Sequence, residues 1–167
     1  MSKKLLLVRH AKSDWADIGL RDFDRPLNKR GLENAPEMGQ RIYVKQIIPD
    51  KIVSSPALRA LTTAKIFAKE WKMDINTITL NLDIYEASLK SLLNVVTELN
   101  DDDDYIALFG HNNAITDLVI YLTDADLFNI PTCGMALIDL PFESWKMVSK
   151  GTGSLVFYDY PKNTSLI

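Results

Sequence analysis

The sequence contains little of the chemistry on which several classes of protein depend. Its 167 residues include one cysteine and two histidines, so no disulfide can form within the chain. No stretch approaches the roughly 20 apolar residues of a membrane span. The short apolar run at residues 5–8 ends in Arg9, which excludes a secretory signal peptide. We therefore expect a cytoplasmic protein that makes no contact with a membrane.

Excess positive charge is also lacking. Acidic residues number 22 against 19 basic ones, giving a formal net charge of −3, and no basic tail or basic helix is present. Nucleic acid is therefore not an expected partner. The apolar content of 47% and charged content of 25% are typical of a globular protein. The length favours one domain over residues 1–167.

The two histidines follow short apolar runs that are typical of buried strands. Residues 5–8 (LLLV) precede Arg9 and His10, and residues 105–110 (YIALFG) precede His111. Continuous apolar runs of this length favour strands of a parallel sheet. Ligands of open α/β sheets bind beyond the carboxyl ends of the strands. One such histidine alone would indicate a loop or capping residue, but the repeated pattern favours a site.

Apolar patterns along the chain predict alternating strands and helices. This order predicts an α/β protein, a three-layer α/β/α sandwich with a mostly parallel sheet and at least one antiparallel edge strand. Residues 15–28 are polar and irregular and are expected to form a loop over the first strand end. The expected helices are 31–46, 57–72, 89–99 and 114–122, and the expected later strands are 50–54, one within 75–84, 105–110, 135–140, 145–148 and 154–158.

Several residues refine these helices. The first helix is expected to bury a stripe of four apolar side chains. Ser88 is expected to cap the helix 89–99, and Asn112 or Asn113 the helix 114–122. The acidic run 101–104 is interpreted as a solvated turn rather than a metal site. The apolar side chains named as part of this stripe are Leu32, Met38, Ile42 and Ile47.

Two further charged residues fall at the predicted carboxyl edge of the sheet. Arg59 lies in the first turn of the helix 57–72, where a cation is unfavourable unless an anion is bound nearby. Glu86 follows the third strand. Together with Arg9 and the two histidines, these residues provide two guanidiniums, two imidazoles and a carboxyl. Such a set, beside helix N-termini, is suited to holding a phosphoryl group.

The residue inventory excludes several designs of phosphoryl-transfer enzyme. No arginine follows Cys133 closely, as a cysteine phosphatase requires. Asp22 and Asp24 lie in a polar loop rather than at the end of an apolar strand, which disfavours an aspartyl-phosphate enzyme. A binuclear metal site needs more histidine and aspartate ligands than this chain can cluster. No glycine-rich loop ends in Lys-Ser or Lys-Thr, so a nucleotide-binding P-loop is excluded.

Once these designs are excluded, a histidine nucleophile remains. A neutral imidazole attacks phosphorus and carries the phosphoryl group. Arg9 and Arg59 would neutralise the phosphoryl oxygens in the transition state and would favour the neutral form of His10. His111 would donate to a phosphoryl oxygen. Glu86 would protonate the leaving group and then activate water.

Three motifs resemble those of the histidine phosphatase superfamily. They are residues 7–11 (LVRHA), 54–64 (SSPALRALTTA) and 110–112 (GHN), and they cover nearly the whole chain in the same order. Within the superfamily, residues 9–15 (RHAKSDW), 24–27 (DRPL) and 85–88 (YEAS) resemble the small SixA-type phosphohistidine phosphatases.

The resemblance implies roles for individual residues. His10 would be the nucleophile, and Arg9, Arg59 and His111 would form the phosphate pocket. Arg25 is similar to an arginine of the SixA motif and would add a phosphate contact. Ser13 and Asn112 lie within matching motifs and are further candidate phosphate ligands. No metal or other cofactor is implied.

Two departures from other superfamily members narrow the function. Mutase members have glycine and asparagine where this chain has Ala11 and Ala16, which disfavours a mutase. The chain is also short and lacks long insertions that enclose small substrates. The leading interpretation is a metal-independent phosphatase that acts on phosphohistidine in a protein and releases inorganic phosphate. The alternatives are a phosphatase of small phosphate esters and a non-catalytic phosphate-binding module; the intact His10–His111 pair disfavours the latter.

Overall fold

The computed structural model describes residues 2–163. The protein contains a six-stranded sheet with the strand order β3-β2-β4-β1-β5-β6. β1, β2, β3 and β4 run parallel to one another, whereas β5 pairs antiparallel with both β1 and the edge strand β6. The mixed sheet with antiparallel pairing at one edge confirms the predicted fold class. The strands are β1 (Lys3–Arg9), β2 (Lys51–Ser54), β3 (Thr79–Leu80), β4 (Tyr105–Gly110), β5 (Met135–Leu140) and β6 (Ser154–Asp159).

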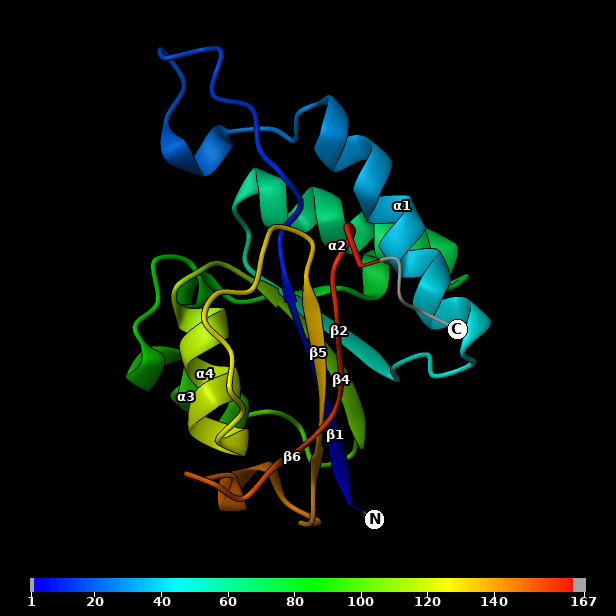
Figure 1. The fold of residues 1–167 in the computed structure, drawn as a ribbon, viewed down its shortest axis with the longest axis vertical. Coiled ribbons are helices and arrows are strands. Elements are labelled where there is room, and N and C mark those ends of the chain that lie inside the picture. The colour runs from blue at the N-terminus through cyan, green and yellow to red at the C-terminus, as the bar shows by residue number, and fades with distance from the viewer. Residues whose placement is uncertain (1, 164–167) are drawn as a thin grey trace.

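Helices cover both faces of the sheet (Figure 1). α1 (Lys29–Val44) and α2 (Leu58–Glu70) pack on one face, and α3 (Leu89–Thr97) and α4 (Ala114–Thr123) pack on the other. The alternation of side chains along β1 divides its apolar run between the two cores. Leu5 and Leu7 join the core beneath α3 and α4, while Leu6 and Val8 join the core beneath α1 and α2.

The helices largely follow the predicted pattern, and side-chain caps mark the starts of α1 and α3. The Asn28 side chain accepts a hydrogen bond from the Gly31 amide at 2.9 Å, so α1 begins two residues before the predicted start. Ser88 caps α3 as expected, through the Ser91 amide. At α4, the Asn112 side chain accepts from the Thr116 amide at 3.2 Å.

The prediction of a buried apolar stripe on α1 is wrong for one of its four residues. Met38 and Ile42 are buried, and Ile47, beyond the helix, packs against the same core. Leu32, in contrast, is 52% exposed. The neighbouring Gly31 packs directly on the chain segment after β1, and this close approach turns Leu32 toward the outside.

The predicted strand at 145–148 is also wrong. Trp145–Met147 is a short 3-10 helix, capped by the Ser144 side chain. The Trp145 indole is buried and donates to the carbonyl oxygens of Asn100 and Asp103 at 3.2 and 3.0 Å. These bonds hold the tryptophan against the turn before β4, so its backbone does not pair with a strand.

The acidic turn at residues 101–104 is at least partly exposed throughout, as expected, and it also holds a buried cation. The Lys3 ammonium is 1% exposed, donates to the Asp101 carbonyl at 2.7 Å and forms an ion pair with Asp104 at 2.8 Å. The Asp104 carboxylate and the Asp101 backbone carbonyl therefore offset a buried cation at the start of β1.

Three further 3-10 helices lie in the connections: η1 (Asp22–Asp24) and η3 (Leu82–Ile84) follow β1 and β3 at the carboxyl edge, whereas η2 (Ile75–Thr77) precedes β3. The third predicted strand is reduced to Thr79–Leu80, between η2 and η3. Over residues 2–163, no helix combines the length and the apolar character needed to cross a bilayer.

Helix propensity alone predicts that replacing Gly31 with alanine stabilises the protein, but the close contact at Gly31 predicts that it destabilises it. Alanine is favoured over glycine in a helix interior by about 1 kcal/mol, but here an added methyl would collide with the Lys12 carbonyl oxygen. We expect Gly31→Ala to lower the free energy of unfolding by about 1–3 kcal/mol, measured by urea denaturation. Glu33→Ala, at an exposed site of the same helix, is the control. A stabilised Gly31→Ala protein would contradict the expected collision.

Candidate active site

The site begins with two imidazoles that follow neighbouring parallel strands. Arg9 and Gly110 are paired in register between β1 and β4, so His10 and His111 leave the sheet side by side. Their ring centroids lie 5.2 Å apart, and the His10 amide donates to the Gly110 carbonyl at 3.0 Å. Only 8% of His10 and 9% of His111 is exposed. The structure thus brings the two predicted histidines together in a nearly buried pair.

The backbone determines which nitrogen of His10 is available for chemistry. Nδ1 lies 2.6 Å from the Ala11 carbonyl oxygen. A carbonyl oxygen only accepts hydrogen bonds, so Nδ1 carries the proton. In the neutral ring, Nε2 then carries the lone pair. His10 is held in the tautomer that a nucleophile attacking through Nε2 requires.

His111 is oriented by a residue that the sequence did not single out. Its Nε2 lies 2.8 Å from the Ser55 hydroxyl, which also accepts a hydrogen bond from the Ala57 amide. When Ser55 donates to Nε2, the His111 proton is on Nδ1. That nitrogen is buried and has no partner among the described residues. The position of Ser55, directly after β2 at the same edge, was the available sequence signal.

Burial and nearby cations favour the neutral form of both rings. Burial, together with the charges of Arg59 and Arg9, lowers the pKa of His10 to about 4, against the opposing effect of the hydrogen bond to Ala11. Burial and the proximity of His10 and Arg59 lower the pKa of His111 to about 3. The direction agrees with the sequence-based expectation, although burial rather than the arginines is the largest cause.

Three of the predicted phosphate ligands are arginines, and two of them have buried nitrogens without a hydrogen-bond partner. Arg9 donates through one terminal nitrogen to the Ile130 carbonyl at 2.9 Å. Arg25 is 8% exposed, and its guanidinium lies 3.6 Å from the ring centre of Trp15. Over residues 2–163, the buried side-chain nitrogens without a hydrogen-bond partner are Arg9 Nε, Arg25 Nε and His111 Nδ1. Unpaired buried donors are costly, and here all three belong to predicted phosphate ligands.

Asp22 is a carboxylate of the site that no sequence pattern indicated. Its backbone oxygen and its Oδ2 accept from Arg59 at 2.7 and 3.0 Å, and Oδ2 also accepts from the Tyr85 hydroxyl at 2.6 Å. Its Oδ1 lies 3.8 Å from Arg25 Nε. The sequence shows Asp22 only as part of a polar loop. Its contacts arise because η1 folds back over the strand ends.

The remaining predicted residues differ in their placement. Ser13 is buried and forms an isolated antiparallel bridge with Leu27. The Asn112 amide donates to Asn129 and the Ile130 carbonyl, and its oxygen accepts from Thr116. Asn112 is therefore engaged in holding the loop before β5.

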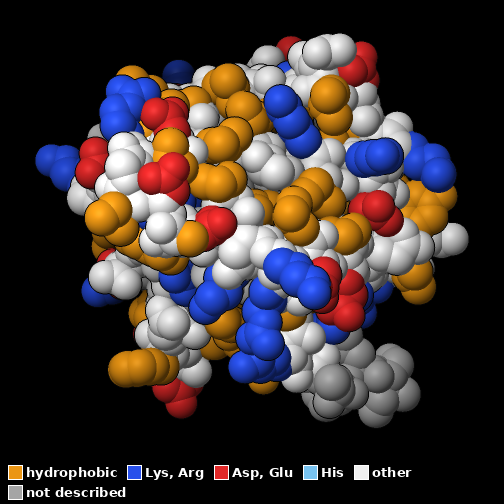
Figure 2. Space-filling view, turned by 90° about the horizontal axis from the view of Figure 1, so that it is seen from above, with side chains coloured by type: hydrophobic (Ala, Val, Ile, Leu, Met, Phe, Trp, Pro, Cys, Tyr) orange, Lys and Arg blue, Asp and Glu red, His pale blue; other side chains and the backbone are white. Residues whose placement is uncertain are grey.

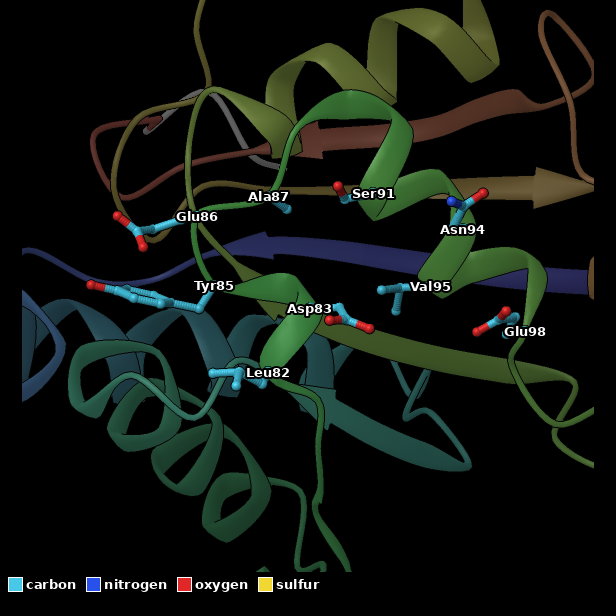
Figure 3. Close-up of a pocket in the computed structure, with 9 residues that line it drawn as sticks. All are labelled: Leu82, Asp83, Tyr85, Glu86, Ala87, Ser91, Asn94, Val95 and Glu98. Atoms are coloured by element: carbon cyan, nitrogen blue, oxygen red, sulfur yellow. The ribbon is translucent and has the colours of Figure 1, made fainter.

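Glu86 is exposed and lies in the left-handed backbone region, with φ of 54°. It contributes to a hollow of about 300 Å³ beside α3, together with Tyr85. Figure 3 shows Glu86 and Tyr85 extending to the same side, away from Ser91 and Asn94 of α3. Because the Tyr85 hydroxyl contacts Asp22, Glu86 lies beside the histidine site but at its margin.

The electrostatic character of this edge favours an anion. Figure 2 looks down on the end of the molecule that carries η1, and Lys and Arg side chains gather below the centre of this face.

Across the described part of the chain, no group of three or more His, Cys, Asp and Glu side chains is arranged to hold a metal ion. The lone Cys133 is buried, and burial raises the pKa of its thiol.

Fold and site together define an α/β protein whose paired imidazoles and guanidiniums suit a phosphoryl group. The model of the histidine phosphatase superfamily (branch 1) matches residues 5–81. An uncharacterised chloroplast protein of Arabidopsis thaliana is 30% identical over 154 residues, covering 87% of this chain and 70% of that protein. The chain belongs to the histidine phosphatase superfamily.

Solved structures share the same fold. A structure from Agrobacterium tumefaciens, assigned as phosphohistidine phosphatase SixA, has a TM-score of 0.82 and 26% identity, covering 96% of this chain and 99% of that chain. The protein histidine phosphatase SixA complexed with tungstate has a TM-score of 0.79 and 16% identity, with coverage of 95% and 97%. Family membership and these likenesses support a phosphatase.

The depressed imidazole pKa values predict that the protein loses stability in mild acid. An unfolded histidine has a pKa of about 6.5, so below that pH the unfolded chain binds protons that the folded protein does not. The free energy of unfolding should therefore fall as the pH is lowered from 7 to 5, by up to about 1.4 kcal/mol per pH unit for each imidazole.

The measurement is urea denaturation at several pH values between 5 and 7. His10 and His111 are the only histidines, so the double variant His10→Gln/His111→Gln should lose most of this slope. A wild-type protein whose stability is constant over this range would contradict the neutral imidazole pair.

Proposed function

We propose that this protein is a metal-independent phosphatase that removes the phosphoryl group from phosphohistidine on a protein, with His10 as the nucleophile. One observation carries the proposal. The Nδ1 bond of His10 to the Ala11 carbonyl leaves Nε2 as the lone-pair nitrogen, and the neighbouring Arg9 and His111 each have a buried, unpaired nitrogen.

The first step forms a covalent phosphoenzyme. His10 Nε2 attacks phosphorus, the bond between phosphorus and the substrate imidazole breaks, and the leaving nitrogen takes a proton from Glu86. Arg9, Arg59 and His111 hold the phosphoryl oxygens, where donors placed in advance stabilise the transition state. If both buried imidazoles were charged, they would repel each other. Their low pKa values keep both rings neutral, which suits this step.

The second step returns the enzyme to its starting state. Water attacks phosphorus, Glu86 accepts a proton from it, and the bond between phosphorus and His10 Nε2 breaks. Inorganic phosphate leaves, and His10 is again neutral with its proton on Nδ1. No step requires a metal ion as Lewis acid, because the guanidiniums supply the positive charge.

Phosphohistidine is the favoured substrate for chemical and structural reasons. The bond between phosphorus and nitrogen breaks easily once the imidazole is protonated, so a marginal acid such as the exposed Glu86 suffices. A small ester gains few contacts beyond its phosphate at an open edge, whereas a protein surface supplies more. The likeness to the SixA structures is consistent with this substrate.

The first experiment tests the covalent mechanism. Wild-type enzyme is incubated with a phosphohistidine-bearing protein in the presence of a metal chelator, and the acid-labile phosphoenzyme is trapped by rapid quenching. We expect turnover and phosphoenzyme in the wild type and neither in His10→Ala. Near-normal turnover by His10→Ala would contradict the nucleophile, and wild-type activity that needs an added divalent ion would contradict metal independence.

A second experiment tests the substrate class. Glu86→Gln should reduce kcat/KM for a phosphate ester far more than for phosphohistidine, because an alkoxide leaving group depends more on a positioned acid. The measurement is kcat/KM for both substrates in both proteins. Equal losses on the two substrates, or a higher wild-type kcat/KM for the ester, would favour a phosphatase of small phosphate esters.

A further inference from the structure

The Arg59 guanidinium is held by a carboxylate from a distant part of the chain. Asp22 accepts from one terminal nitrogen of Arg59 through its backbone oxygen and from the other through Oδ2, at 2.7 and 3.0 Å. A guanidinium has five N–H donors in a fixed plane. The contacts with Asp22 restrain that plane while leaving the Nε–H and further N–H groups for a second anion.

Asp22 is itself held in place by the aromatic side of the site. The Tyr85 hydroxyl donates to Oδ2 at 2.6 Å. The Tyr85 ring contacts Phe23 edge-on at 5.2 Å and His111 edge-on at 5.6 Å between ring centres. η1, Tyr85 and His111 therefore form one contiguous support, and Asp22 connects this support to Arg59.

We infer that Asp22 is a positioning residue that orients the Arg59 guanidinium for the phosphoryl group and that Tyr85 supports it. The inference rests on the proposed phosphoryl site and assigns Asp22 no contact with substrate. Its effect passes through Arg59, since a guanidinium that is free to rotate loses the alignment on which transition-state stabilisation depends.

The charge of Asp22 has a second, separable consequence. The hydrogen bond from Tyr85 and the pairing with Arg59 hold the pKa of the Asp22 carboxyl below its usual value, so it is ionised at neutral pH. An ionised carboxylate offsets part of the Arg59 charge that a bound oxyanion would feel. Asparagine at this position keeps the hydrogen-bond acceptor but removes the charge, so geometry and charge are tested separately.

The experiment compares Asp22→Ala and Asp22→Asn. Tungstate binding is measured by calorimetry, and kcat and KM are measured with 4-nitrophenyl phosphate. We expect Asp22→Ala to lower kcat/KM by about 10- to 100-fold and to weaken tungstate binding about tenfold, the effect of one charged hydrogen bond. Asp22→Asn should keep most of the wild-type kcat and bind tungstate at least as tightly as the wild type.

Two controls separate positioning from general damage. Asp24 lies in the same 3-10 turn but pairs outward with the exposed Arg21, so Asp24→Ala should behave as the wild type. Tyr85→Phe removes the hydroxyl that holds Asp22 and keeps the ring contacts. It should shift tungstate binding in the same direction as Asp22→Ala, by a smaller factor. The Asp22 side chain is 46% exposed. Thermal melting is used to check that each variant is folded.

A double-mutant cycle tests the route through Arg59. Asp22→Ala should have no further effect on tungstate binding in an Arg59→Ala background. An equal loss in both backgrounds, or unchanged or tighter tungstate binding by Asp22→Ala, would overturn the inference. Tungstate binding does not depend on the substrate. A wild type that binds tungstate but hydrolyses no phosphohistidine therefore counts against the proposed function alone.

Discussion

The parallel pairing of β1 with β4 is the constraint on which the site depends. Because Arg9 lies opposite Gly110, the next residue of each strand is a histidine at the same level of the sheet. The Cys133 amide donates to the carbonyl oxygens of Arg9 and His10 at 3.0 Å, which holds the end of β1 from the other side. A shift of one residue in this register would turn the imidazoles to different faces.

This arrangement carries an energetic cost that the rest of the fold offsets. Buried imidazoles, guanidinium nitrogens and an unpaired His111 Nδ1 are each unfavourable in a folded protein. The two apolar cores beneath the helices supply the compensating burial. Buried polar atoms without a partner are expected where a protein binds a ligand, and among the described residues they are at the end of β1 (Arg9), directly after β4 (His111) and after η1 (Arg25).

Much of the architecture was predictable because its signals are periodic or local. Apolar runs and capping residues identified the order of elements, the Ser88 cap and the convergence of His10 and His111. Leu32 and Trp145 were misjudged because their positions depend on partners elsewhere in the chain. Leu32 is exposed beside a helix glycine that approaches the Lys12 backbone, and Trp145 is anchored by carbonyl groups before β4.

The sequence by itself determined the fold class, the two histidines at strand ends and the arginines beside them, because strand patterns repeat and scarce residues stand out. Only the tertiary structure decided that Ser55 orients His111, that His10 is protonated on Nδ1 and that Asp22 reaches Arg59 and Tyr85. The contacts of Asp22 with Arg59 and Tyr85 join residues that are 37 and 63 positions apart in the sequence. A loop carboxylate has no periodic pattern, so its partners are set by how the chain folds back over the sheet.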